Sequence, residues 1–207
     1  MPNLFDSAQR AAWLAPLLDR ATPFDSLQAP LIILDRDGVI NQDSDLYIKS
    51  PAEWQPIPGS LSAIAALNQA GIRVAVATNQ SGLARGLFDT DTLAAIHHKM
   101  RDQLLAVGGH IDHLVYCPHA PVDQCNCRKP EPGLYQQIAT HFQCTLHGVP
   151  VIGDNGRDLA AAEHVNACPI RVLTGKGPLT AADPRWASIP SFNNLQDAVD
   201  YLLEPLL

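Results

Sequence analysis

The sequence predicts an α/β fold, a doubly wound parallel sheet with helices on both faces. Two observations support this: short apolar runs alternate with longer segments of helical periodicity, and polar residues follow the carboxyl ends of several runs. Alternating strands and helices form parallel sheets, because each helical crossover returns the chain to the same edge of the sheet. A chain of 207 residues is long enough for one domain with a substantial core.

The first 29 residues are predicted to be an N-terminal extension of a single domain over residues 30–207. A helix is expected over Ser7–Arg20, because Trp13 and Leu14 begin an apolar stripe, although Pro16 strains its middle. Such a stripe most often packs on the core, and an oligomer contact is the alternative.

Five strands and five further helices are expected in the domain. The strands are predicted over 31–34, 72–77, 111–116, 149–152 and 170–173. The helices are predicted over 60–70, with Ser60 as N-cap and Gly71 closing it, and over 89–107, 134–142, 159–165 and 193–203. The irregular segment 42–58, called the flap below, contains three prolines and follows the first strand directly, so it is expected to border a binding site.

Composition excludes several classes of function. The net charge of -7 disfavours nucleic-acid binding, which needs clustered positive charge. We see no apolar run of about 18 residues and no basic start followed by an apolar stretch, so neither a membrane span nor a secretory signal is expected. We expect a cytoplasmic monomer with a small-molecule substrate.

Asp35 and Asp37 follow the first predicted strand, where ligands bind in open α/β sheets. A strand-end carboxylate can attack phosphorus and form an aspartyl-phosphate, and a second carboxylate can protonate the departing alcohol. We assign the nucleophile to Asp35 and the acid–base role to Asp37. This division of labour requires Asp35 to be ionised and Asp37 to carry a proton near neutral pH.

Three further polar motifs complete this prediction. Asp154 follows the fourth strand, and Asp35, Asp154 and the main-chain carbonyl of Asp37 form an oxygen-only set that suits Mg²⁺. Thr78 and Lys129 are expected to bind the oxygens of the transferring phosphoryl group, so both join the catalytic set. Asp158 is expected to support the cluster. The reaction class is phosphate-monoester hydrolysis.

Cys117, His119, Cys125 and Cys127 lie within eleven residues, in the pattern Cys-x-His-x₅-Cys-x-Cys. Three thiolates and one imidazole match a closed tetrahedral zinc site of the structural kind. Ordering this loop costs on the order of 11 to 22 kcal/mol, and zinc supplies roughly 10 to 16 kcal/mol in small sites. We therefore expect structural Zn²⁺, with buried reduced thiols as the alternative. Cys144 and Cys168 are expected to be core residues.

The ordered motifs resemble those of the haloacid dehalogenase superfamily: Asp35-x-Asp37, Thr78-Asn79-Gln80, Arg128-Lys129-Pro130 and Gly153-Asp154. With the zinc loop and Val39-Ile40-Asn41, the match over about 31–177 resembles the branch of D-glycero-D-manno-heptose-1,7-bisphosphate 7-phosphatases. The histidinol-phosphate phosphatases are the alternative branch. The resemblance implies a capless enzyme in sugar-phosphate metabolism, supplying nucleotide-activated heptose for surface lipopolysaccharide.

The resemblance also implies that the flap and the zinc loop shape the pocket, with Arg128 gripping the distal part of the substrate. The expected substrate-binding residues are Asp43, Ser44, Asp45, Leu46, Thr78, Asn79, Gln80, Ser81, Arg128 and Lys129. Asn155 departs from the Ser or Lys of relatives, which leaves its contact with substrate open. A rival from another class is a catalytically silent, zinc-stabilised binding protein.

Overall fold

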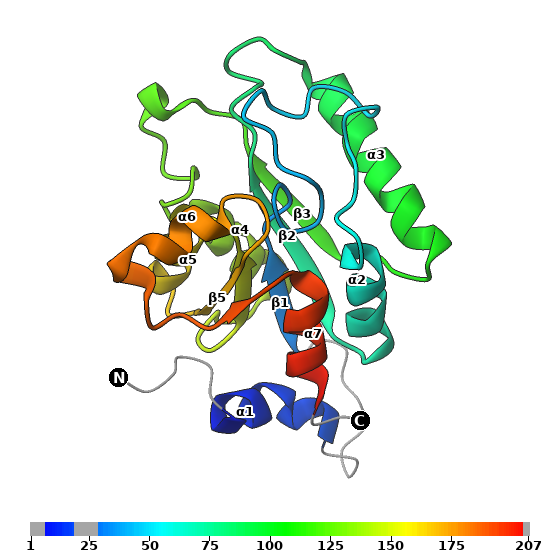
Figure 1. The fold of residues 1–207 in the computed structure, drawn as a ribbon, viewed down its shortest axis with the longest axis vertical. Coiled ribbons are helices and arrows are strands. Elements are labelled where there is room, and N and C mark those ends of the chain that lie inside the picture. Colours follow the sequence, from blue (N-terminus) through cyan, green and yellow to red (C-terminus); the bar gives the residue numbers. More distant parts are fainter. Residues whose placement is uncertain (1–6, 19–28, 205–207) are drawn as a thin grey trace.

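A computed structural model shows a six-stranded, all-parallel sheet in the order β3-β2-β1-β4-β5-β6 (Figure 1). The structure describes residues 7–18 and 29–204, with side chains of residues 7–15 in the first range. The strands are β1 Leu31–Leu34, β2 Arg73–Asn79, β3 His113–Cys117, β4 Pro150–Gly153, β5 Cys168–Val172 and β6 Ser191–Phe192. The predicted doubly wound parallel sheet is confirmed.

Strand β1 lies at the centre of the sheet and is buried on both faces. Because side chains alternate along a strand, Ile32 and Leu34 join one hydrophobic cluster, while Leu31 and Ile33 join the cluster on the opposite face. A run of four aliphatic residues is therefore fully buried, which fixes the position of Asp35 at its carboxyl end.

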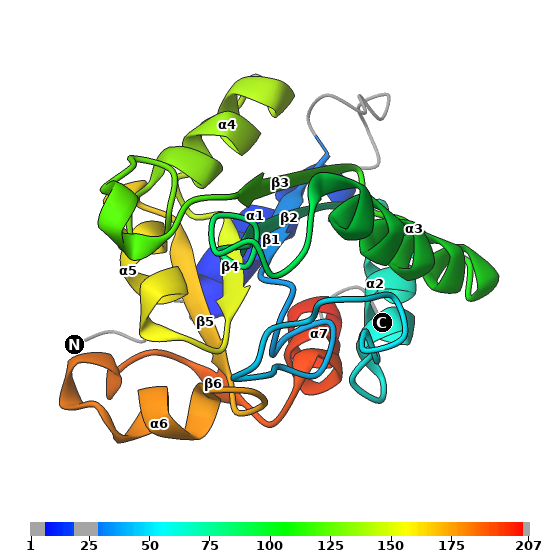
Figure 2. The same ribbon diagram turned by 90° about the horizontal axis from the view of Figure 1, so that it is seen from above.

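Helices cover both faces of the sheet, as Figure 2 shows from above. Helices α2 Ser60–Gln69, α3 Thr90–Ala106 and α7 Leu195–Leu203 lie on one side, and α4 Gly133–Phe142 and α5 Gly156–His164 lie on the other. The short elements are α6 Gly177–Ala182 and two 3₁₀ turns, Pro121–Asp123 and Pro184–Trp186. Within the described residues, no helix has the length and apolar character needed to cross a bilayer.

The predicted N-cap of α2 is wrong. Gly59 caps the helix with a φ of 86°, and Ser60 instead donates its hydroxyl hydrogen bond to the Ile40 carbonyl at 2.7 Å. A serine beside a glycine is a good cap candidate by sequence, but here a buried partner on another segment competes for its hydroxyl. Strand β6 and helix α6 were not predicted, because two and six residues are too short to show a period.

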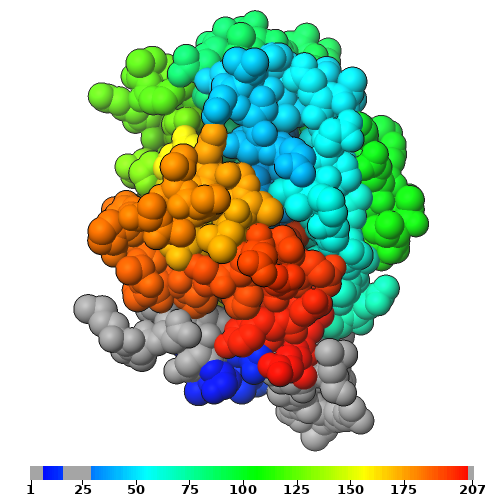
Figure 3. Space-filling view, in the orientation of Figure 1, coloured from blue at the N-terminus to red at the C-terminus, as the bar shows by residue number. Residues whose placement is uncertain are grey.

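The flap, residues 42–58, is fixed to the body of the protein at its second half. Trp54 is completely buried, and the Lys99 ammonium of α3 donates to the carbonyls of Pro51 and Trp54 at 2.7 and 2.8 Å. Figure 3 shows the flap in light blue beside the orange segment that follows β5. The second half of the flap is therefore an ordered part of the structure beside the carboxyl ends of the strands.

Helix α1, Ser7–Leu18, lies at the opposite end of the sheet, below the amino end of β1 (Figure 1). The Trp13 indole nitrogen donates to the Leu31 carbonyl at 3.0 Å, and Leu14 is fully buried in the cluster that contains α2 and α7. Arg10 contacts the Tyr201 carbonyl at 2.5 Å. The extension thus packs on the core, while the predicted end of this helix at Arg20 lies outside the described residues; the boundary at residue 29 stays a prediction.

Replacing Leu14 with alanine tests this docking. Because Leu14 is fully buried, we expect Leu14→Ala to lower the free energy of unfolding by about 2 to 4 kcal/mol, measured by urea unfolding at equilibrium. Ala11→Ser, on the exposed side of the same helix, should change it by less than about 0.5 kcal/mol. Equal stability of both variants would contradict docking of α1.

Candidate active site

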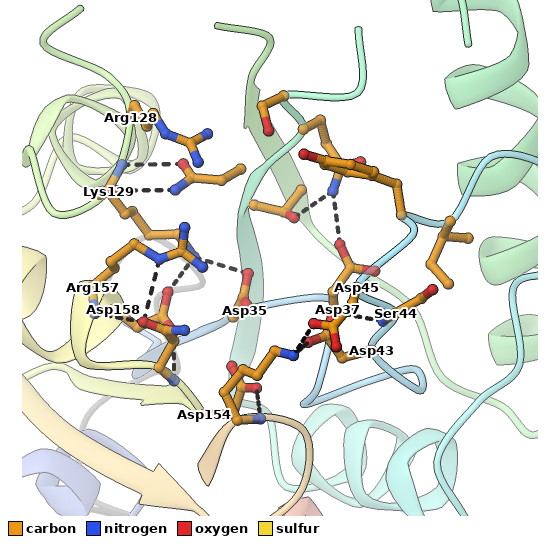
Figure 4. A pocket seen from close by; sticks show the side chains of 18 residues that line it. Asp35, Asp37, Asp43, Ser44, Asp45, Arg128, Lys129, Asp154, Arg157 and Asp158 are labelled. Carbon is orange, nitrogen blue, oxygen red and sulfur yellow. Dashed lines mark hydrogen bonds and ion pairs between the residues drawn. The ribbon is translucent and has the colours of Figure 1, made fainter. Parts of the chain in front are cut away.

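A polar pocket opens at the carboxyl ends of β1, β2 and β4, with a volume of about 230 Å³ (Figure 4). It gathers residues from all four predicted motifs and from the flap. They are Asp35, Asp37, Asp43, Ser44, Asp45, Tyr47, Ile48, Thr78, Asn79, Gln80, Ser81, Arg128, Lys129, Asp154, Asn155, Arg157, Asp158 and Lys176. Of the predicted substrate-binding residues, Leu46 alone does not line this pocket; its side chain is 73% exposed.

Lys129 lies at the floor of the pocket and is only 2% exposed. Its ammonium nitrogen lies 2.8 Å from Asp35 Oδ1, 2.6 Å from Asp158 Oδ1 and 2.7 Å from the Ala77 carbonyl, so each of its three hydrogens has a partner. Burial alone would lower the pKa of Lys129, but Asp158 and Asp35 outweigh burial and raise the pKa above its usual range. Lys129 is therefore a permanent cation beside Asp35.

Asn79 holds the segment that carries Lys129. Its side-chain amide donates to the Lys129 carbonyl at 3.0 Å and accepts from the Lys129 amide at 3.1 Å. This reciprocal pair links the end of β2 to residues 128–130, where the Lys129–Pro130 peptide bond is cis. Asn79, predicted to bind substrate, thus lines the pocket while its side chain is hydrogen-bonded to the Lys129 backbone.

Asp35, Asp154 and Asp158 form a carboxylate cluster in which one oxygen from each residue lies within 4.8 Å of the others. Burial first, and then neighbouring carboxylates, raise the pKa of Asp35 to about 7 and that of Asp154 to about 8, although Lys129 opposes the rise at Asp35. Buried carboxyl groups this close repel one another when ionised. An oxygen-only donor set of this kind suits Mg²⁺, which would stabilise the ionised forms.

The backbone packs closely around Asp154. A Cβ atom on Gly38 would lie 2.2 Å from Asp154 Oδ2, and one on Gly175 would lie 2.1 Å from the same oxygen. Both glycines have positive φ, 85° and 54°. The Lys176 amide also donates to Asp154 Oδ2 at 2.6 Å. Two loops therefore converge on one carboxylate, and a glycine is required where each of them touches it.

Asp37 lies beside this cluster, and its carboxylate accepts hydrogen bonds from three side chains. Arg36 contacts both oxygens at 2.8 Å, Asn41 donates to Oδ1 at 2.9 Å, and Gln80 donates to Oδ2 at 2.9 Å. Burial would raise the pKa of Asp37, but Arg36 and these hydrogen bonds outweigh it and hold the pKa below its usual range.

The expected order of the two pKa values is therefore reversed in the protein alone. We predicted an ionised Asp35 and a protonated Asp37, whereas burial raises the pKa of Asp35 and Arg36 lowers that of Asp37. The sequence places Arg36 between the two aspartates, but it does not show which of them the guanidinium contacts. The carboxylate of Asp37 is also absent from the cluster, so only its main-chain carbonyl remains a predicted Mg²⁺ ligand.

Thr78 and Gln80 lie at the end of β2 and are almost fully buried. The Gln80 amide donates to the Thr78 hydroxyl at 2.8 Å and accepts from Arg36 at 3.2 Å. Gln80, predicted to bind substrate, thus connects Thr78 with the Arg36–Asp37 pair at the pocket wall.

Lys176 is a pocket residue that the sequence analysis missed. It follows β5, and its ammonium pairs with Asp45 and lies 3.6 Å from Asp43, both in the flap. Its position at the carboxyl end of a strand is the signal that could have identified it. Lys176 joins the flap to the loop that contacts Asp154. Arg157 was missed as well; its side chain lines the pocket beside Asn155, which it contacts at 3.2 Å.

The four predicted zinc ligands gather at the end of β3. Their sulfur atoms lie 3.3 to 3.6 Å apart, and His119 Nδ1 lies 3.6 Å from Cys117 Sγ and 3.3 Å from Cys127 Sγ. In a tetrahedral site with Zn–S bonds of about 2.3 Å, two sulfurs lie about 3.8 Å apart. The observed spacing fits a tetrahedral zinc site. Arg128, next to the loop, donates to the His119 carbonyl at 3.2 Å.

Known proteins match this chain closely. A family model described as HAD-hydrolase-like matches residues 126–198. The D-glycero-beta-D-manno-heptose-1,7-bisphosphate 7-phosphatase of Bordetella bronchiseptica is 58% identical over 152 residues, 73% of this chain and 85% of that protein. The protein of the same name from Pseudomonas aeruginosa is 49% identical over 174 residues, 84% of this chain and 98% of that protein.

A solved structure matches as well. The crystal structure of D,D-heptose 1,7-bisphosphate phosphatase from B. bronchiseptica, complexed with magnesium and phosphate, superposes with a TM-score of 0.82 and 52% identity. The match covers 84% of this chain and 98% of that one. From the site and these likenesses, the chain belongs to the family of heptose-1,7-bisphosphate 7-phosphatases, within the haloacid dehalogenase-like hydrolases.

Proposed function

We propose that this Mg²⁺-dependent phosphatase removes the 7-phosphate of D-glycero-β-D-manno-heptose 1,7-bisphosphate through an aspartyl-phosphate on Asp35. The observation that carries the proposal is the contact at 2.8 Å between the Asp35 carboxylate and a buried lysine, beside Asp154, in a polar pocket. Relatives that cover most of this chain bear the name of this activity. The product would feed nucleotide-activated heptose for lipopolysaccharide, in the cytoplasm.

In the proposed reaction, an Asp35 oxygen attacks phosphorus, and the bond between phosphorus and the sugar oxygen breaks. In the protein alone the pKa of Asp37 lies below its usual range, so Asp37 must take up a proton when the anionic substrate binds. It transfers this proton to the sugar oxygen, and the heptose 1-phosphate leaves. Asp37 then takes a proton from water, whose oxygen attacks the aspartyl-phosphate and releases phosphate and free Asp35. Lys129 and Thr78 border the same space. Thr78 would donate its hydroxyl hydrogen to a phosphoryl oxygen, and Lys129, whose three hydrogens have partners in the protein, would stabilise the phosphoryl oxygens by its charge.

Asp35, Asp154 and the Asp37 carbonyl would hold the magnesium ion in this proposal. When bound, the ion lowers the repulsion between an anionic nucleophile and an anionic phosphate. The protein itself contributes the rest of the charge balance, because Lys129 is a cation whose contacts with Asp35 and Asp158 fix its position. The Lys176 amide keeps Asp154 oriented.

The far end of the pocket would bind the sugar and its second phosphate. Arg128 lies at the pocket edge, and Asp43, Ser44 and Asp45 of the flap line the opposite wall. Histidinol phosphate, the substrate of the alternative branch, lacks a second phosphate and carries a cationic amine. Two guanidinium groups, those of Arg128 and Arg157, line the pocket and suit a second phosphate group. This favours the bisphosphate as the substrate.

Asp35→Asn tests the nucleophile. The asparagine amide lacks the anionic oxygen that attacks phosphorus. We therefore expect kcat to fall by at least about 1,000-fold, measured as Mg²⁺-dependent phosphate release. Circular dichroism and zinc content should remain those of the wild type. Asp91→Asn, on the exposed first turn of α3, is the matched control. A fully active Asp35→Asn protein would refute the proposed chemistry.

Comparison of substrates tests the assignment. We expect kcat/KM for the β-anomer of the heptose bisphosphate to exceed that for histidinol phosphate by more than about 100-fold, because paired cationic and polar groups of the pocket would lack partners on the smaller substrate. The α-anomer of the heptose bisphosphate is assayed as the third substrate, to measure the anomer preference. A preference for histidinol phosphate would move the chain to the alternative function while leaving the phosphatase chemistry intact.

Cys127→Ser tests the zinc loop. We expect the purified wild-type protein to contain about one Zn²⁺ per chain and Cys127→Ser to lose it, because a structural site needs all four ligands. KM for the heptose bisphosphate should rise in this variant, because the His119 carbonyl of the zinc loop accepts a hydrogen bond from Arg128 and loss of zinc would release that contact. Cys144→Ser, outside the cluster, should keep its zinc. Elemental analysis decides, and wild-type protein without zinc would refute the site.

A further inference from the structure

Helix α3 carries two adjacent histidines with different surroundings. His98 is exposed, and its ring lies 3.5 Å from Asp102 on the same helix. His97 is only 6% exposed, and its ring contacts Arg36, which in turn contacts the pocket residue Gln80. The catalytic roles proposed above use neither residue, so the burial of His97 requires its own explanation.

His97 contacts the active site through Arg36. Its Nε2 atom lies 3.2 Å from Arg36 Nη1, while the guanidinium has no exposed surface. A guanidinium can only donate, so Nε2 must be the acceptor, and the proton of the neutral ring lies on Nδ1. Burial, followed by Arg36 and Arg101, lowers the pKa of His97 to about 3, so the ring is neutral at physiological pH.

The other nitrogens of Arg36 face Asp37. Nε and Nη2 both donate to the carboxylate, and Nη2 also lies 3.2 Å from Gln80 Oε1. Among residues 7–18 and 29–204, His97 is therefore the partner of Nη1, on the side of the guanidinium away from Asp37. Without it, a buried N–H group would lack an acceptor, and the guanidinium would have to turn to find one.

We propose that His97 is a positioning residue for phosphate-ester hydrolysis, fixing the Arg36 guanidinium that in turn places the Asp37 carboxyl group. The proposal rests on the proposed function, and specifically on Asp37 as the proton donor to the leaving group. His97 touches neither substrate nor metal ligand in this arrangement. Its effect is transmitted across two contacts, His97 to Arg36 and Arg36 to Asp37.

Two substrates with different leaving groups can distinguish a positioning role of His97 from a merely structural one. When a sugar phosphate is cleaved, the departing oxygen needs the proton of Asp37 as the bond to phosphorus breaks. With p-nitrophenyl phosphate, the nitrophenolate departs as a stable anion and needs no proton. Asp37 also acts as the base in hydrolysis of the aspartyl-phosphate, a step that both substrates share, so the aryl phosphate is followed in its first turnover. A misplaced Asp37 should slow cleavage of the sugar phosphate and leave the first-turnover burst of nitrophenolate nearly unchanged. A loosened fold would slow both.

The experiment compares three variants on both substrates with saturating Mg²⁺. For His97→Leu, we expect kcat on the heptose bisphosphate to fall by roughly 10-fold or more. KM and the rate constant of the first-turnover burst of nitrophenolate should stay within about threefold of wild type. His97→Gln, which offers an amide oxygen to Arg36, should recover most of the lost kcat. His98→Leu on the neighbouring exposed position should match the wild type.

Equal losses in kcat on the sugar phosphate and in the nitrophenolate burst, no loss, or the same loss in His97→Gln as in His97→Leu would overturn the proposal. If His97→Leu does not fold, His97→Asn, whose amide is too short to reach Arg36, takes its place with the same expected results. Failure of the proposed function is seen separately, because wild-type protein would then not cleave the heptose bisphosphate and Asp35→Asn would not abolish turnover.

Discussion

The buried ion pair of Lys129 with Asp35 and Asp158 is the constraint on which the rest of the site depends. One ammonium between two carboxylates joins β1, the segment before α4 and the first turn of α5 at a single point. A buried lysine without these partners would be strongly destabilising, because its desolvation would be uncompensated. The same contacts that satisfy Lys129 hold Asp35 where a phosphate ester would be attacked. Stability and chemistry therefore share the same atoms.

Net charge explains why a cation suits this pocket. Asp35, Asp154 and Asp158 face one ammonium, while Asp37 is paired with Arg36. The cluster thus contains more negative than positive charge, and burial raises the pKa values of Asp35 and Asp154 well above their usual range. Such carboxyl groups gain from a divalent ion, which lets both ionise together. The excess of carboxylates is a poor arrangement for a structural core and a good one for a magnesium-dependent enzyme.

Features of the fold and site that depend on local pattern could be predicted from the sequence. Leu31 to Leu34 show a buried strand, and strand-end position places Asp35 and Asp154 at one edge of the sheet. Features that depend on contacts between distant segments could not. Ser60 donates to Ile40 in place of capping its helix, and Lys176 meets the flap only because β5 lies next to β4. The direction of the Arg36 side chain, which lowers the pKa of Asp37, likewise involves contacts with Gln80 and His97 from distant segments.

The two sides of the pocket differ in how they are held, which bears on what each can contribute. Asp35, Lys129 and Asp154 are fixed by buried ion pairs, hydrogen bonds and glycine contacts that leave no room for adjustment. The flap wall is held at Trp54 by deep burial, but at Asp43 and Asp45 by the partly exposed Lys176, a contact that solvent screens. A rigid floor suits the phosphoryl transfer, which every substrate shares. An ion pair at the rim that can exchange its partner suits the recognition of an anionic sugar, so specificity is expected to reside at residues 43–45 and at Lys176 more than at the floor.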